Sequence, residues 1–287
     1  MTQTVAESET VHVDAVGSLG RRRRSPVANA LRLVGPPLVL FVAVAALWYA
    51  ARPVFGVPKY LLPTPGETWE ALNSDWSVLW SHARITLGTA VIGFTISAVV
   101  GIGLGIMVVL SPLFARSVYP YVIASQTFPK MALAPILVVW LGLGLAPKVA
   151  MASLVTFFPI VVATIVGLNS VNPDELLLAR SMGVKKSGVL TKIRLPAALP
   201  SIFGGLKVAG NLALVGAVVG EFIASSRGLG YQLTVAMSSL NTARLFAALI
   251  VLAVSGIIVY CLIGACEYLF LPWRRHRKQR PVTVTEQ

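Results

Sequence analysis

The residues of this chain best suited to chemistry lie in one polar stretch, residues 169–203, where glycine, lysine and serine occur together. Such residues form the loops that cradle nucleotide phosphates, in which four positions separate a glycine from a Gly-Lys-Ser/Thr run. The two nearest runs, Gly183-Val184-Lys185-Lys186-Ser187 and Gly204-Gly205-Leu206-Lys207, lack that spacing. The sequence therefore predicts that any energy from ATP comes from another chain.

The histidines and cysteines form no recognisable site. His12, His82 and His276 are scattered, and no zinc-ligand spacing is present. Cys261 and Cys266 are five positions apart, which places them on different faces of a helix, so we expect packing residues rather than a disulfide or a metal pair. We predict no catalytic residues, no cofactor and no metal, and therefore not an enzyme.

Composition indicates a membrane protein. Only 12% of the 287 residues are charged, 56% are hydrophobic, and the mean hydropathy is +0.78. A soluble domain carries roughly 25% charged residues, so this chain has too little polar surface for a water-soluble globule. Disorder, a coiled coil and a soluble enzyme are excluded for most of the chain, and an all-α polytopic membrane protein is predicted.

The gaps between charges locate the crossings, because a bilayer core of about 30 Å requires about 20 helical residues. The third run is interrupted by Lys130, directly after Pro129. Six transmembrane helices are predicted, at residues 33–51, 85–110, 117–147, 151–168, 206–223 and 245–266.

Lysine and arginine placement sets the orientation. With the N-terminus inside, 17 basic residues fall in inner segments and 6 in outer segments, so both termini are predicted to be cytoplasmic. The formal net charge of +13 follows from this topology, and no basic face with interleaved aromatic residues points to nucleic acid. We expect disordered basic tails at residues 1–30 and 272–287, a first crossing with an outer segment at 31–84, and a core at 85–271.

Two further patterns concern packing. Thr64-Pro65 is typical of a helix start, and Trp69, Trp76 and Trp80 share one face of a helix expected to lie on the outer membrane surface. Gly101-x-x-x-Gly105 is a spacing of small residues that allows helices to approach closely in lipid.

The inner loop at residues 169–203 predicts a hairpin of two short helices. Asn172-Pro173-Asp174-Glu175 is a helix start, and Gly183 is a suitable left-handed residue after its end. A second, basic helix is expected from about residue 185 to 193, ended by Pro196. The apolar side of the hairpin either lies against lipid headgroups or docks in a cleft of a cytoplasmic partner.

The same loop resembles the coupling loop of ATP-binding-cassette importer permeases. The matching residues are Glu175-x-x-x-Ala179-x-x-x-Gly183 and, nine residues later, Ile193-x-Leu195-Pro196; Leu176 and Leu177 stand where the family has alanines. The runs 60–65, 129–135, 140–144, 157–159 and 220–230 are similar to the nitrate/sulfonate/taurine branch, which includes permeases for thiamine precursors and riboflavin.

The resemblance implies a type I importer-like bundle in a bacterial inner membrane, with a cytoplasmic ATPase dimer, an extracytoplasmic substrate-binding protein and a second permease copy as partners. The residues implied in coupling are Asp174, Glu175, Ala179, Gly183, Ile193, Leu195 and Pro196.

Ionisable residues within crossings are candidates for the translocation pathway, and here these are Lys130 and Glu221, with Gln126 as a third polar candidate. Lys130 either attracts an anionic substrate or reaches an interface, and Glu221 is expected to meet headgroups or the binding protein. The rival interpretation is an ion-coupled carrier or channel, but no internal repeat is visible and only Lys130 is deep.

Overall fold

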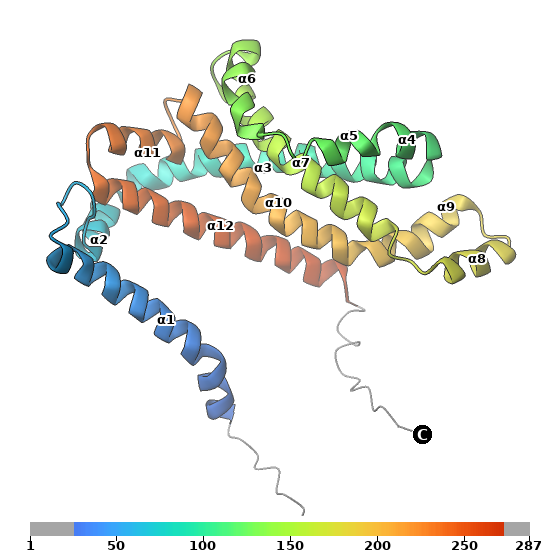
Figure 1. The fold of residues 1–287 in the computed structure, drawn as a ribbon, viewed down its shortest axis with the longest axis horizontal. Helices are drawn as coiled ribbons and strands as arrows, with labels where there is room; N and C mark the ends of the chain where they lie inside the picture. Colours follow the sequence, from blue (N-terminus) through green and yellow to red (C-terminus); the bar gives the residue numbers. More distant parts are fainter. Residues whose placement is uncertain (1–25, 273–287) are drawn as a thin grey trace, which may run out of the picture.

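The computed structural model describes residues 26–272, and within this range every regular element is helical (Figure 1), which confirms the all-α prediction. The predicted tails lie almost wholly outside the described residues, except that residues 26–30 already belong to the first helix. Within residues 26–272, five helices are long and apolar enough to cross a membrane. They are α1 (Pro26–Phe55), α3 (Trp76–Leu110), α7 (Leu145–Leu168), α10 (Leu195–Ala224) and α12 (Thr242–Phe270).

Helix α3 begins nine residues before the predicted crossing. The expected surface helix is only α2 (Pro65–Ser74), and Trp76 and Trp80 belong to α3 instead. The reason is Leu79, which is fully buried in a cluster with Leu229 of α11 (Leu229–Ser238) and Ala247 of α12. The predicted cap of α2 is confirmed by its Thr64 hydroxyl, which accepts a hydrogen bond from the Glu67 amide.

The prediction of one helix for the third crossing is wrong. The segment after α3 is divided into α4 (Pro112–Ser117), α5 (Tyr119–Ala124), a 3-10 helix η1 (Lys130–Leu133) and α6 (Ala134–Leu141). A proline lies within the first two residues of each piece or immediately before it, and each removes a backbone donor and disfavours helix in the residue before it. The apolar helix over Lys130–Leu141 is too short to span about 30 Å.

Helices α3 and α7 run parallel. An added Cβ at Gly93 would lie 2.6 Å from Ala152 Cβ, and one at Gly105 would lie 2.7 Å from Thr164 Cβ, so residue numbers increase together along both helices. The chain between α3 and α7 must therefore return from one end of the bundle to the other. The broken segment of α4 to α6 makes this return.

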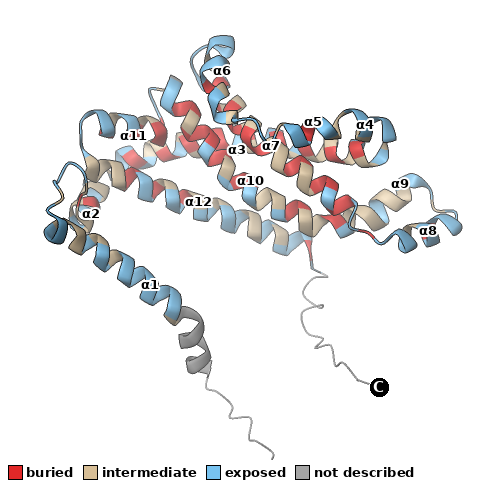
Figure 2. Ribbon diagram, viewed as in Figure 1, coloured by how far each residue is buried: buried red, intermediate tan, exposed pale blue. Residues whose placement is uncertain are grey.

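Helix α7 is packed between α3 and α10 by small residues. Ala152 of α7 is fully buried, with Gly93 of α3 on one side and Gly216 of α10 on the other. An added Cβ at Gly216 would lie 2.7 Å from Ala152 Cα. Figure 2 shows the buried residues concentrated where α3, α7 and α10 meet, whereas α1 is largely exposed.

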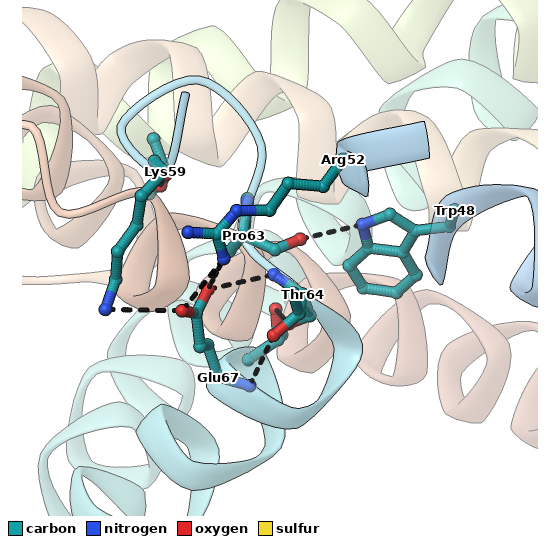
Figure 3. Close-up of polar contacts among 8 residues, drawn as sticks. Trp48, Arg52, Lys59, Pro63, Thr64 and Glu67 are labelled. Carbon is teal, nitrogen blue, oxygen red and sulfur yellow. Dashed lines mark hydrogen bonds and ion pairs between the residues drawn. The ribbon is translucent and has the colours of Figure 1, made fainter. Parts of the chain in front are cut away.

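A polar network holds the end of α1 against α2 (Figure 3). The Trp48 indole N–H donates to the Pro63 carbonyl at 3.0 Å, and the Arg52 guanidinium lies 3.0 Å from Glu67 Oε1. Lys59 Nζ lies 3.2 Å from the same oxygen. The Thr64 backbone amide, with the help of these two cations, lowers the pKa of Glu67 to about 2, so the carboxylate is ionised at any physiological pH.

Close packing of α3 on α7 yields a test with a matched control. Gly105→Ala should lower the stability of the purified protein by about 1–3 kcal/mol, because the new methyl overlaps Thr164. Gly103→Ala, on the same helix, meets nothing within 4 Å and should cost little. Thermal unfolding in detergent measures both, and equal melting temperatures for the two variants would contradict this packing.

Candidate functional site

The first arm of the predicted hairpin forms as the sequence indicates. Helix α8 (Pro173–Ser181) begins where the Asn172 side chain accepts a hydrogen bond from the Asp174 amide at 3.0 Å. It ends at Ser181, two residues before Gly183, whose φ of 75° is left-handed. The Val184 amide donates to the Ala179 carbonyl at 3.1 Å and so closes the helix end.

The outer surface of α8 is apolar and has no partner among residues 26–272. Leu177, Leu178 and Met182 are 61%, 63% and 74% exposed, whereas Ala179 is buried. The carboxylates of Asp174 and Glu175 are also exposed, at the helix end whose free amides favour negative charge. An apolar surface with an acidic edge suits a groove in another protein.

The second arm differs from the prediction, because Pro196 does not end it. Helix α9 (Lys186–Val189) passes into a wide π-helical turn η2 (Leu190–Arg194) and then directly into α10. In this turn the Leu195 amide donates to the Leu190 carbonyl, a five-residue step. Pro196 then falls in the first turn of α10, where its missing N–H costs little.

The hairpin base is held by the membrane helices. Leu190 and Leu195 pack against a buried cluster of Leu168, Ala198 and Ile202, to which α3 also contributes. Ile193 and Pro196 are half-buried nearby in the chain. A displacement of α8 would therefore pass through the bend at Gly183 into α9, and from there through a continuous helical backbone into α10.

The three candidates for the pathway occupy different surroundings. Lys130 is half-buried at the start of η1, with Nζ 5.3 Å from the centre of the Phe158 ring. Gln126 is exposed in the turn between α5 and η1. Among the described residues, no hydrogen bond or ion pair joins Lys130 to Glu221.

Glu221 is buried, with 1% of its surface exposed, so the expected contact with headgroups or a binding protein is wrong. Its carboxylate accepts hydrogen bonds from the Thr86 hydroxyl of α3 at 2.9 Å and from the Gly230 amide of α11 at 2.9 Å. Thr86 in turn accepts from the Leu229 amide at 2.8 Å. Glu221 therefore joins α3, α10 and α11 at the end of the bundle opposite the hairpin.

A second layer of polar groups surrounds this carboxylate. His82 Nδ1 accepts from the Gly228 amide at 2.8 Å, so its Nε2 carries the proton. The Gln232 side-chain amide lies 2.8 Å from that Nε2, and in the orientation that presents its oxygen it accepts the Nε2 proton. These interactions fix the loop between α10 and α11.

Sequence reasoning missed the partners of Glu221 and the burial of Lys148. Lys148 is 7% exposed and its Nζ lies 3.0 Å from the Ser225 hydroxyl. One signal was available: Gly228-Leu229-Gly230 follows Glu221 closely. An added Cβ at Gly230 would lie 2.8 Å from Glu221 Cβ, so glycine is required there.

Among the described residues, no three His, Cys, Asp or Glu side chains are grouped as a metal site requires.

The Glu221 junction gives a second test. Glu221→Gln places an amide N–H₂ group against the Thr86 hydroxyl or the Gly230 N–H, and it should lower stability by about 1–3 kcal/mol. The loop should also loosen, so trypsin should cleave faster after the exposed Arg227. Ser226→Ala, at an exposed position in the same loop, is the control. Unchanged cleavage in Glu221→Gln would contradict this role.

Comparison with known proteins shows which family has this architecture. The family described as binding-protein-dependent transport system inner membrane component matches residues 97–268, which include the hairpin and Glu221 but not its α3 partner Thr86. The formylaminopyrimidine transport permease protein ThiX of Halalkalibacterium halodurans is 36% identical over 240 residues, covering 83% of this chain and 96% of that protein. The riboflavin transport system permease protein RibX of Chloroflexus aurantiacus is 35% identical over 259 residues, covering 88% and 96%.

Two more distant comparisons agree. The taurine transport system permease protein TauC of Escherichia coli is 26% identical over 257 residues, covering 87% of this chain and 92% of that protein. A crystal structure of an amino acid ABC transporter with histidines matches 70% of this chain and 96% of its own with a TM-score of 0.56; at 17% identity it shows the fold alone. The chain therefore belongs to the family of binding-protein-dependent transport system inner membrane components, as a permease subunit of an ABC importer.

Proposed function

We propose that this permease is driven by a separate cytoplasmic ATPase dimer that holds the hairpin at residues 169–203. The observation that carries the proposal is the exposed apolar surface of α8, joined through η2 to the spanning helix α10. Closure of an ATPase dimer around α8 would pull on α9 through the bend at Gly183, and α9 continues into α10 without a break in the helix.

Each residue implied in coupling has a physical part in this proposal. Asp174 and Glu175 present charge at the edge of the docking surface, and Ala179 lets α8 lie close to the rest of the hairpin. Gly183 supplies the left-handed bend between the arms. The remaining three, at the hairpin base, fix its exit into the membrane: Ile193, Leu195 and Pro196.

A second permease copy is proposed to cover the broken segment. Irregular backbone at membrane depth is tolerated only where protein buries it or where it lines a water-filled cavity. In the single chain this segment exposes large apolar side chains, among them Val139 and Trp140 at 81% and 76%. A homodimer in contact here would place Lys130 and Gln126 beside the pathway, while Glu221 would position the loop before α11.

The proposed topology has both termini and the hairpin in the cytoplasm of a bacterium, with the α2 and α11 end outside. An extracytoplasmic binding protein would deliver the solute there. Since the similar permeases are named for formylaminopyrimidine, riboflavin and taurine, the proposed solute is a small organic or anionic molecule of the sulfonate, nitrate, taurine, pyrimidine or riboflavin type.

Solute uptake by cells and copurification of the ATPase test the coupling role. Gly183→Val should abolish uptake at normal expression, because a β-branched residue at φ 75° costs about 1–3 kcal/mol and distorts the bend. Gly183→Asn should retain uptake, since Asn tolerates this conformation. Glu175→Ala should also abolish uptake, with the exposed Lys185→Ala as its control.

Wild-type uptake in both Gly183→Val and Glu175→Ala would contradict the coupling role of the hairpin. Solute movement across vesicles by the chain without an ATPase would instead support an ion-coupled carrier or channel.

A further inference from the structure

A cavity of about 300 Å³ lies between the end of α3, α4 and both arms of the hairpin. Its walls are of two kinds. Leu110 and Pro112 contribute an apolar side from the segment where α3 ends, and Leu176 and Val189 contribute another from the hairpin. The volume is at the small end of the range for ligand sites, sufficient for a compact charged group with a short apolar extension.

Three cations line this cavity, each from a different element. Arg180 belongs to α8, Lys186 to α9 and Arg194 to η2, and no acidic residue lines the cavity with them. Within residues 26–272, none of the three forms an ion pair or a side-chain hydrogen bond. The acids of the hairpin, Asp174 and Glu175, are in the first turn of α8 and are not among the lining residues.

The position of the cavity restricts its ligand. It opens where the spanning part of α3 ends and where α10 begins, so one side faces the boundary between hydrocarbon and water. Val108, in the last turns of α3, is buried at its base. A ligand that fits must carry negative charge at one end and apolar chain at the other.

We infer that this cavity binds the phosphate group of an anionic phospholipid. Arginine and lysine recognise phosphate oxygens by charge-assisted hydrogen bonds, and the apolar wall of α3 accommodates the start of the acyl chains. The bound headgroup would join the hairpin arms to the end of α3. This site is separate from the ATPase-facing surface of α8, so the inference does not depend on the proposed function.

Lipid binding by the full-length chain, purified in detergent and stripped of lipid, tests the inference. Dioleoylphosphatidylglycerol should raise the melting temperature saturably, and dioleoylphosphatidylcholine should have little effect. Arg180→Gln/Arg194→Gln should weaken the phosphatidylglycerol affinity by at least about tenfold, since each cation near a phosphate contributes roughly a fivefold effect. The control, Lys185→Gln/Lys192→Gln, removes the same charge from exposed positions of the hairpin outside the cavity and should leave the affinity within about twofold.

Equal weakening in the two double variants would overturn the inference, because it would indicate general attraction of a basic surface to anionic lipid. Equal stabilisation by the two lipids would overturn it as well. Saturable stabilisation by inorganic phosphate alone, lost in Arg180→Gln/Arg194→Gln, would overturn phospholipid as the source of the phosphate. If that variant does not melt cooperatively, Lys186→Gln is compared with Lys185→Gln in the same assay, with the same expectations.

Discussion

The contact of Ala152 with a glycine on either side is the constraint on which the rest of the structure depends. Helices gain little from burying apolar surface in lipid, so their association rests on close approach and van der Waals packing. Gly93 and Gly216 permit that approach on the two faces of α7, and Gly105 continues it along α3. Because α3, α7 and α10 are held in this way, the hairpin that connects α7 to α10 has a firm base.

The chain thus combines a tightly packed unit with an irregular one. The second arm of the hairpin is continuous with α10 through the π-helical turn at Leu190–Arg194, so a displacement of that arm is carried into the membrane core. The segment from α4 to α6 has its helices interrupted by prolines and leaves its apolar side chains exposed. Alternating access requires two packings of similar energy, and a boundary between a rigid unit and a broken one is suited to that change. The Glu221 junction fixes the opposite end, where α3, α10 and α11 meet.

Local signals in the sequence were sufficient for the presence of five spanning helices and for the caps of two short ones. The cap at Thr64 and the left-handed Gly183 are decided by residues within one helical turn, and the structure confirms both. Long-range packing decided the features that the sequence did not reveal. Leu79 extends α3 because it meets α11 and α12, and Pro196 continues a helix because a π turn precedes it. Glu221 is buried because Thr86, distant in sequence, supplies a hydrogen-bond partner. The coupling and pathway residues remain predictions.

The most direct test of the central claim breaks the helical link and leaves both of its ends intact. Two glycines inserted between Arg194 and Leu195 would rotate α10 by about 200° relative to the hairpin and weaken the backbone between them. We expect the ATPase to copurify and to hydrolyse ATP while solute uptake is lost. The same insertion after Gly56, in an open turn, should preserve uptake. Wild-type uptake with the glycines between Arg194 and Leu195 would contradict transmission through a continuous helix.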